Sequence, residues 1–368
     1  MSVFMNGHRP IGVGANEMAL LVSGGVDSAL AAHLLCEQGS RPDLFYIRIG
    51  SDDGGNGCSI EEDLEFSSLL ARRYGLHLEV VDLRQAYEER VTAYVIDRLR
   101  RGLTPNPDVL CNKLVKFGAF EDYAGYQYRR IATGHYARVL HEGGGLWLGT
   151  SPDVVKDQTD FLSQIDRKVL QKVVFPVGDF MKRDVRVLAD ALKLPPASRR
   201  DSQGICFLGR IDYAAYVGRL MGTRPGDIVE RETGRVLGRH KGYWSLTIGQ
   251  RKGMGLAGGP WYVTDKDTEH NIVYVSRRGV ADGEKGRAFL VRDFHFVSGD
   301  PWYGAEMAAV AFKIRHTMAP CPACLCRKPD GDFLVRPESP LQGIAPGQFC
   351  VLYTLDGRIC AGSGEIRC

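Results

Sequence analysis

A six-residue turn, SGGVDS at residues 23–28, has the composition of a phosphate-binding loop. It joins the apolar run ALLV to an amphipathic run that begins at Asp27, DSALAAHLL. Adjacent glycines let backbone N–H groups approach an anion, and the N-terminus of the following helix adds a positive partial charge. Asp27 and Ser28 could bind a metal-coordinated phosphate or only cap the helix. Neither the Walker A nor the dinucleotide glycine pattern is present, so the alternatives are another class of phosphate site and a structural turn.

Two of the ten cysteines lie in settings that favour a reactive thiolate. Cys111 follows two prolines in TPNPDVLC, and the pattern CNKLVKFGAF predicts a helix that begins at this cysteine, with Lys113 and Lys116 just after it. Cys206 lies among arginines in SRRDSQGICFLG. A helix N-terminus or nearby cations lower the pKa of a thiol, so both cysteines are candidate nucleophiles. The alternative for each is a small buried hydrophobic residue.

The first part of the chain alternates strand-like and helix-like segments. Between residues 18 and 135, apolar runs such as MALLV and DLFYIRI alternate with amphipathic runs of helical periodicity. This alternation predicts an α/β fold with a doubly wound, mostly parallel sheet, in which ligands bind beyond the carboxyl ends of the strands. The turn at residues 23–28 would then lie at the ligand-binding edge.

The last third of the chain has a different composition and pattern. After Gly222 it becomes rich in glycine and β-branched residues, and runs such as RAFLVRDFHFV and QFCVLYTLDGRICAGSGEI predict short antiparallel strands of a barrel. We therefore expect four parts: a leader over residues 1–17, an α/β catalytic domain over 18–215, a small mixed domain over 216–285 and a C-terminal β-barrel domain over 286–368.

The charge distribution predicts a polyanionic partner for the middle of the chain. The net charge of the 368 residues is +3, but residues 197–252 contain eleven Lys and Arg against five Asp and Glu. A basic island is typical of nucleic-acid binding, and a solvated basic face is the alternative. The chain has no apolar run of roughly 18 residues and no export signal. We expect a cytoplasmic protein whose cysteines do not form a disulfide scaffold.

A third group of cysteines, CPACLC at residues 321–326, has a spacing that zinc or iron–sulfur sites use. Such a site would need a fourth ligand, and ordinary barrel cysteines are the commoner interpretation. We therefore assign no metal site to Cys321, Cys324 and Cys326.

Further stretches give the chain a specific resemblance. SGGVDS resembles the Ser-Gly-Gly-x-Asp-Ser loop of the N-type ATP pyrophosphatases (PP-loop enzymes), which have an adenine nucleotide alpha hydrolase-like fold. With NPDVLCN, ATGHYAR, KDQTDFL, GICF and APGQFCVLYTLDGRICAGSGEI, the chain from about Met18 to Ile366 is similar to the bacterial tRNA-specific 2-thiouridylases. The resemblance implies ATP-dependent conversion of the wobble uridine of tRNA to 2-thiouridine, assisted by Mg²⁺, with AMP and pyrophosphate as by-products.

The resemblance also implies roles for individual residues. Cys206 receives sulfur from a sulfur-carrier protein and then carries a persulfide. This persulfide either attacks C2 directly or loses its terminal sulfur when Cys111 forms a transient disulfide with Cys206. Asp108 is the candidate acid or base. The ATP-binding positions are Leu21, Val22, Ser23, Gly24, Gly25, Val26, Asp27, Ser28, Tyr46 and Gly134. The positions for the target base are Asn106, Pro107 and Asp108, and those for tRNA are His135, Lys156, Asp157, Gln158, Arg315, His316 and Gln348.

We expect the substrate to be tRNA of the glutamate, lysine or glutamine type, held in part by the central domain, and the enzyme to be a monomer that does not contact a membrane. Two alternatives remain open. One is another ATP-dependent ligase of the argininosuccinate synthetase kind, which has no use for two reactive cysteines. The other is an RNA-binding protein that retains the phosphate loop only as structure and tolerates serine at Cys111 and Cys206.

Overall fold

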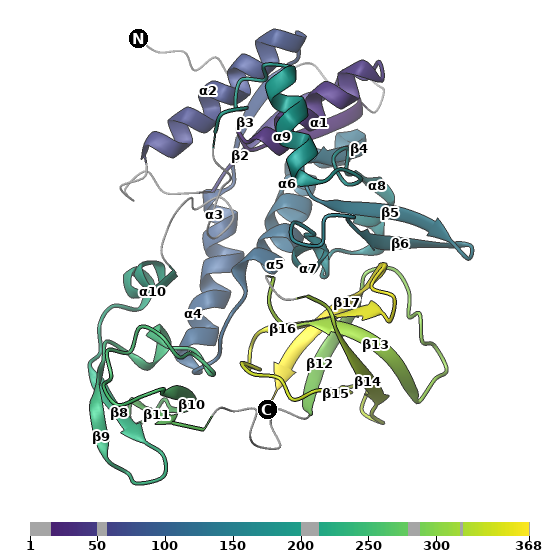
Figure 1. Ribbon diagram of the computed structural model, residues 1–368. Helices are drawn as coiled ribbons and strands as arrows, with labels where there is room; N and C mark the ends of the chain where they lie inside the picture. Colours follow the sequence, from purple (N-terminus) through teal and green to yellow (C-terminus); the bar gives the residue numbers. More distant parts are fainter. Residues whose placement is uncertain (1–15, 50–56, 200–212, 279–287, 317–318, 368) are drawn as a thin grey trace.

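The computed structural model describes residues 16–49, 57–199, 213–278, 288–316 and 319–367. Three sheets organise these residues: a parallel sheet covered by helices, a small mixed sheet and a closed antiparallel barrel (Figure 1). This arrangement confirms the predicted fold class. No helix within the described ranges is long and apolar enough to cross a membrane.

The parallel sheet has the strand order β3-β2-β1-β4-β7. Its strands span Asn16–Val22 (β1), Asp43–Arg48 (β2), Leu78–Asp82 (β3), Tyr128–Thr133 (β4) and Val173–Val174 (β7). Strands β2 and β3 lie on one side of β1, and strands β4 and β7 lie on the other side. In such sheets the ligand crevice forms where the strand order reverses, so the loops after β1 and β4 are the expected binding edge.

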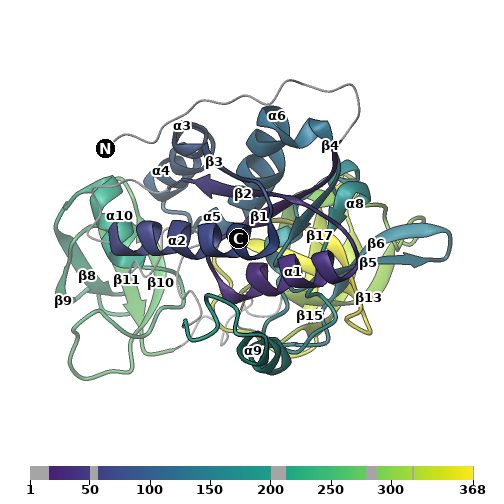
Figure 2. The same ribbon diagram turned by 90° about the horizontal axis from the view of Figure 1, so that it is seen from above.

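Alternate side chains of the strands pack on opposite faces of this sheet. Leu20 and Val22 of β1 pack with α1 (Val26–Glu37), α2 (Gly57–Tyr74) and α9 (Lys182–Ala191). Ala19 and Leu21 face the helical segments that follow β3. Figure 2 shows these two helical layers on either side of the strands. Burial on both faces explains why the strands read as continuous apolar runs.

Two helical segments that change between α and π geometry cover the second face. The first comprises α3 (Arg84–Tyr87), η1 (Glu88–Thr92) and α4 (Ala93–Arg100), and the second comprises α5 (Pro107–Cys111), η2 (Asn112–Ala119) and α6 (Phe120–Tyr123). Shorter helices are η3 (Gly125–Gln127), α7 (Thr159–Leu162), α8 (Arg167–Lys172) and η4 (Tyr243–Ser245). The π turns η1 and η2 lie against each other. Such turns are frequent at functional sites.

The four-stranded sheet packs against α4 and α10. Its order is β10-β11-β8-β9, with only the pair β11 and β8 parallel. The elements span Tyr213–Met221 (α10), Gly226–Glu230 (β8), Val236–His240 (β9), Tyr262–Asp267 (β10) and Ile272–Ser276 (β11). Val95 and Leu99 of α4 share one core with Val217 of α10 and with Trp244 and Trp261. This core fixes α10 to α4.

Six antiparallel strands close into the C-terminal barrel through the pair β12 and β17. They span Phe289–Phe296 (β12), Met307–Lys313 (β13), Cys321–Arg327 (β14), Phe333–Pro337 (β15), Phe349–Thr354 (β16) and Ile359–Arg367 (β17). The hairpin of β5 (Ala137–Glu142) and β6 (Gly145–Thr150) pairs with the first residues of β17. A hairpin that directly follows β4 in the chain thus joins the parallel sheet to the barrel.

Candidate active site

The predicted phosphate loop lies at the carboxyl end of β1 and closes onto the first turn of α1. The Ser23 N–H donates to Ser28 Oγ (3.3 Å), and the Ser28 hydroxyl donates to the Gly25 carbonyl oxygen (3.1 Å). The helix begins at Val26, so its first N–H groups face the same edge of the sheet. This is the geometry in which a helix N-terminus binds a phosphate group.

Two glycines shape this cradle. Gly24 has a φ of +66°, and a Cβ atom there would lie 2.5 Å from Asp63 Cα. Gly134 directly follows β4, and a Cβ atom there would lie 2.8 Å from Ser28 N. A side chain at either position would push the loop away from its neighbours. The structure therefore brings the predicted nucleotide positions after β1 and β4 together, with a shape that fits a phosphate ligand.

Asp27 is the charged group of the loop, and two residues from distant segments bind its carboxylate. The Lys182 ammonium lies 2.6 Å from Asp27 Oδ1 and 2.7 Å from Oδ2, and the Tyr136 hydroxyl donates to Oδ1 at 2.7 Å. The Asp27 side chain remains 30% exposed. A carboxylate in this position suits a divalent cation, and an ammonium beside it suits a phosphate oxygen.

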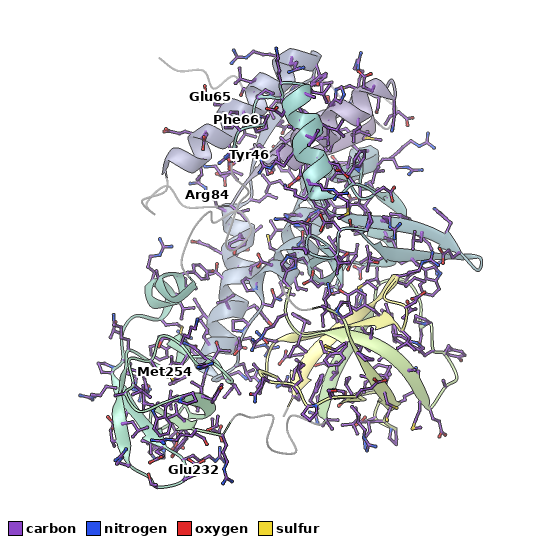
Figure 3. The ribbon with its side chains drawn as sticks, in the orientation of Figure 1. Tyr46, Glu65, Phe66, Arg84, Glu232 and Met254 are labelled. Carbon is purple, nitrogen blue, oxygen red and sulfur yellow. The ribbon has the colours of Figure 1, made fainter. Side chains whose placement is uncertain are left out.

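Tyr46 lies in the interior between β2 and α2. Its hydroxyl donates to Asp63 Oδ2 at 3.2 Å. Figure 3 labels Tyr46 near Glu65 and Phe66 of α2. Burial raises the pKa of Tyr46, and the negative charge of Asp63 raises it further. The guanidinium of Arg199 also binds Asp63 and donates to the Gly24 carbonyl oxygen (3.2 Å). Arg199 therefore holds the chain against the phosphate loop immediately before residues 200–212, and Cys206 lies outside the described residues.

The predicted helix start at Cys111 is wrong. Helix α5 begins four residues earlier, at Pro107, and Asn106 caps it by accepting the Val109 N–H (3.4 Å). Asn followed by Pro is a strong helix start, because the side chain caps the helix and proline needs no N–H partner. The helix N-terminus therefore lies next to Asp108, whereas Cys111 is buried at the end of α5.

Cys111 and Asp108 lie beside Tyr87 of α3. Burial raises the pKa of Tyr87, and the neighbouring acidic groups of Tyr216, Cys111 and Asp108 raise it further. Tyr216 belongs to α10, the first described helix after residue 212. Of the described residues that flank 200–212, Arg199 therefore lies at the phosphate loop, and Tyr216 lies beside Tyr87 and Asp108.

His135, predicted to contact tRNA, is buried between β4 and η2. The Lys116 ammonium lies 3.4 Å from His135 Nε2, and His135 Nδ1 lies 2.8 Å from Thr133 Oγ1. Burial lowers the pKa of His135 well below its ordinary value, and the charge of Lys116 lowers it further. Because an ammonium can only donate, Nε2 accepts and Nδ1 carries the proton. His135 is therefore a neutral imidazole with a fixed tautomer.

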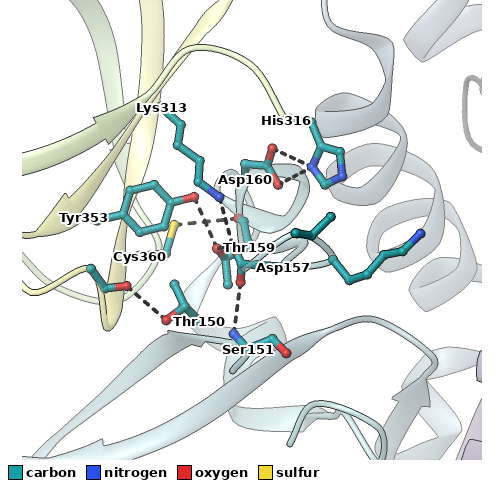
Figure 4. A network of polar contacts seen from close by, with 12 residues as sticks. Thr150, Ser151, Asp157, Thr159, Asp160, Lys313, His316, Tyr353 and Cys360 are labelled. Carbon is teal, nitrogen blue, oxygen red and sulfur yellow. Dashed lines mark hydrogen bonds and ion pairs between the residues drawn. The ribbon is translucent and has the colours of Figure 1, made fainter. Parts of the chain in front are cut away.

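The KDQ stretch predicted to contact tRNA belongs to a loop of residues 151–158 that Asp157 anchors in the interior (Figure 4). Asp157 and Lys313 of β13 are 3% and 2% exposed, and Lys313 Nζ lies 3.3 Å from Asp157 Oδ2. The Thr159 hydroxyl donates to Oδ2 (2.7 Å) and the Ser151 N–H to Oδ1 (3.0 Å). Burial raises the pKa of Asp157, while Lys313, Thr159 and Ser151 oppose the rise. Asp157 holds the loop to the barrel.

The remaining predicted tRNA positions lie just after β13 and just before β16. His316 stacks on Phe161, with ring centroids 4.3 Å apart, and its Nδ1 lies 3.0 Å from Asp160 Oδ2 (Figure 4). Arg315 donates to a backbone carbonyl oxygen before β16 (3.1 Å). The amide oxygen Oε1 of Gln348 is buried without a hydrogen-bond partner among the described residues. An unpaired buried amide oxygen is available to a donor on a ligand.

Comparison with known proteins shows which family the chain belongs to. Residues 16–210 match the family model described as "tRNA methyl transferase HUP domain", residues 214–277 the "tRNA methyl transferase PRC-barrel domain" and residues 286–366 the "Aminomethyltransferase beta-barrel domain". The chain is 53% identical over 351 residues to "tRNA-specific 2-thiouridylase MnmA 1" of Bacteroides thetaiotaomicron, covering 95% of this chain and 99% of that protein. This chain belongs to the tRNA-specific 2-thiouridylase family. The resemblance predicted from the sequence is confirmed.

Two other members of the 2-thiouridylase family show the same extent of similarity. "tRNA-specific 2-thiouridylase MnmA 2" of Bacteroides fragilis is 52% identical over 352 residues, and "tRNA-specific 2-thiouridylase MnmA" of Porphyromonas gingivalis is 50% identical over 357 residues. In both cases the match covers 95% of this chain and 99% of the relative. The similarity therefore includes the parallel sheet, the mixed sheet and the barrel.

In this 2-thiouridylase family member, sequence reasoning missed Lys182, which binds Asp27 across 155 positions. One signal was present in the sequence. Lys182 and Arg183 open a helix, where cations oppose the helix dipole. An unfavourable cation at this position indicates an anionic partner elsewhere in the fold.

The barrel cysteines of this 2-thiouridylase family member form a pair of thiols. Cys324 and Cys326 project from the same side of β14, with their sulfur atoms 3.9 Å apart. Within the described ranges, no three or more His, Cys, Asp and Glu side chains gather in a way that could hold a metal ion.

Proposed function

We propose that this member of the 2-thiouridylase family uses ATP to replace the C2 oxygen of the wobble uridine in tRNA by sulfur. The observation that supports the proposal most strongly is the cradle of residues 23–28, in a chain about half identical over its length to proteins named 2-thiouridylases. The alternative of a ligase of the argininosuccinate synthetase kind gives no role to Cys111 and Cys206.

The phosphate loop would prepare the C2 oxygen for departure. A carbonyl oxygen is a poor leaving group, but its attack on the α-phosphate of ATP makes an adenylate and releases pyrophosphate, so that AMP can leave later. The backbone N–H groups at residues 23–28 would hold the phosphates, with Lys182 supplying positive charge. Asp27, whose side chain is 30% exposed, would hold Mg²⁺, which would offset the charge on the leaving pyrophosphate.

The two cysteines would deliver the sulfur. A sulfur-carrier protein would leave a persulfide on Cys206. In one route the terminal sulfur of the persulfide attacks C2, AMP leaves, and Cys111 then attacks the Cys206 sulfur and frees 2-thiouridine. In the other route Cys111 attacks first and expels hydrosulfide, which attacks C2. Both routes end in a Cys111–Cys206 disulfide that an external dithiol must reduce. Asp108 is placed at the start of α5 to exchange a proton in this step.

We further propose that the mixed sheet and the barrel hold tRNA of the glutamate, lysine or glutamine type. The target base would be captured by Asn106, Pro107 and Asp108, since chemistry on a base requires it to leave the stack. Because Asp157 is buried with Lys313, its part in tRNA binding would be to fix the positions of its neighbours Lys156 and Gln158.

The nature of the added atom tests this function. Two of the three matching family models carry the words "methyl transferase" in their names, whereas the curated relatives are named thiouridylases. Mass spectrometry of the wobble nucleoside, after incubation of tRNA with the protein, ATP and a persulfide sulfur donor, distinguishes the two. A mass increase equal to the exchange of oxygen for sulfur supports the proposal. A nucleoside heavier by one methylene, formed only with a methyl donor, would contradict it.

Gly24→Ala is expected to lower the rate of pyrophosphate release on the order of a hundredfold, because the new Cβ displaces the loop from its position. Gly39→Ala is the matched control. Gly39 has a φ of +81° but open space around it, so both variants introduce backbone strain and only Gly24→Ala meets a neighbouring backbone. Equal pyrophosphate release from the two variants would show that the loop does not bind the nucleotide.

A further inference from the structure

Two chains of hydrogen bonds connect the 151–158 loop to the phosphate loop. The first passes through the buried carboxylate of Asp153. Its Oδ1 accepts the backbone N–H groups of Val155 (3.2 Å) and Lys156 (3.1 Å), and its Oδ2 accepts the backbone N–H of Lys182 (2.8 Å). One carboxylate thus fixes both the turn that carries Lys156 and the residue whose ammonium holds Asp27.

The second chain passes through Tyr136. The Gln158 N–H donates to the Tyr136 carbonyl oxygen (2.9 Å), and the Tyr136 N–H donates back to Gln158 Oε1 (3.0 Å). The Tyr136 hydroxyl then donates to Asp27 Oδ1 (2.7 Å). The ring of Tyr136 is fully buried, so the hydroxyl moves only with the backbone that Gln158 holds.

Both chains end at the same carboxylate. Asp27 accepts from Tyr136 and from Lys182, and no step in either chain is longer than 3.2 Å. The outer end of the loop faces solvent, since Val154 and Val155 are 62% and 79% exposed. A ligand that binds this exposed end would fix a segment whose inner contacts position Asp27 and its partners.

We propose that Asp153 and Tyr136 are positioning residues that make tRNA binding and nucleotide binding favour each other. This inference rests on the proposed function, because it takes the 151–158 loop as a tRNA site and residues 23–28 as a nucleotide site. A ligand that orders Lys182 and Tyr136 removes part of the entropy loss that the second ligand would otherwise suffer. The consequence for function is that ATP is bound most tightly when the uridine to be activated is present.

Tyr136→Phe and Asp153→Asn test the two chains separately. Tyr136→Phe removes only the hydroxyl bound to Asp27. Asp153→Asn replaces one acceptor by an NH₂ group, which cannot accept either the Lys182 N–H or the N–H groups of Val155 and Lys156. The dissociation constant of an ATP analogue with a non-cleavable α,β-bridge is measured with Mg²⁺, with and without saturating unmodified tRNA.

For the wild type, we expect tRNA to tighten binding of the analogue by about fivefold or more. In each variant the ratio should fall toward one. Two matched controls should keep the wild-type ratio. Tyr128→Phe removes a hydroxyl that donates to Asp43 (2.8 Å) at the opposite end of β4, and Asp356→Asn alters a carboxylate that accepts the Arg358 N–H (3.1 Å) in a barrel hairpin.

An unchanged ratio in both Tyr136→Phe and Asp153→Asn would overturn the inference, as would a ratio of one in a wild type that binds both ligands. If Asp153→Asn does not fold, Tyr136→Phe decides alone, because its ring and backbone contacts remain. Failure of the proposed function looks different: the wild type then does not bind the analogue at all, or binds it and never thiolates tRNA.

Discussion

Replacing either Cys111 or Cys206 by serine is expected to lower tRNA thiolation by roughly a thousandfold or more. Serine at position 206 cannot carry a persulfide, and serine at position 111 cannot form the disulfide that frees the transferred sulfur. Adenylation does not use either sulfur, so pyrophosphate release in the presence of tRNA should continue. The two products are measured together, thiolated tRNA by its retardation on a mercury-containing gel and pyrophosphate by an enzyme-coupled assay.

Cys36→Ser provides the matched control for this experiment. Cys36 is a buried cysteine in α1 of the same parallel-sheet unit, and burial raises the pKa of its thiol. Its substitution changes a buried sulfur to oxygen without touching the site, and the variant should thiolate tRNA at the wild-type rate. Wild-type thiolation by both Cys111→Ser and Cys206→Ser would contradict the proposed roles and would favour a protein that only binds RNA.

Lys313→Met is expected to destabilise the protein by about 3–5 kcal/mol, because it leaves the buried carboxylate of Asp157 without its cation. The double substitution Asp157→Asn with Lys313→Met removes both charges and keeps the amide oxygen that accepts the Ser151 N–H, so most of the stability should return. Urea unfolding followed by tryptophan fluorescence measures both changes. Equal losses in the single and double variants would show that the two charges do not depend on each other.

The stability of Lys313→Met should also depend on pH with a defined sign. Burial already raises the pKa of Asp157, and loss of the lysine charge raises it further. The folded protein then binds a proton more readily than the unfolded chain, so its stability increases as the pH falls. The loss of unfolding free energy relative to the wild type should shrink as the pH falls from about 7 to about 4. Near pH 4 the carboxyl of the unfolded chain also becomes protonated. A deficit that grows on acidification would contradict this sign.

Local patterns in the sequence sufficed for the parallel sheet and for the turn of residues 23–28 between β1 and α1. The strands and helices of this unit are contiguous apolar or amphipathic runs, and the loop at residues 23–28 is one short motif. The helix start at Cys111 was predicted from the run CNKLVKFGAF, whereas Asn106 and Pro107 before it are the cap and first residue of α5. Asparagine followed by proline is the stronger helix-start signal.

The contacts that complete the site could not be predicted from the sequence, since they join residues far apart in the chain. Lys182 reaches Asp27 from α9, and Lys313 reaches Asp157 from the barrel. Asp157 lies in the polar stretch KDQ, in which nothing indicates burial. The pairing of β6 with β17, together with hydrogen bonds from Ser163 and Gln164 to Ser363, brings the barrel close enough to bury it.

The most direct test of the central claim is ATP-dependent thiolation by the purified protein. It is incubated with unmodified tRNA of the glutamate or lysine type, ATP, Mg²⁺ and a persulfide sulfur donor, and the tRNA is resolved on a mercury-containing gel while AMP is quantified. The account predicts a retarded tRNA band that requires ATP, with AMP formed in step with thiolation. A retarded band that forms equally well without ATP, or tRNA that binds but yields neither AMP nor thiolation, would contradict it.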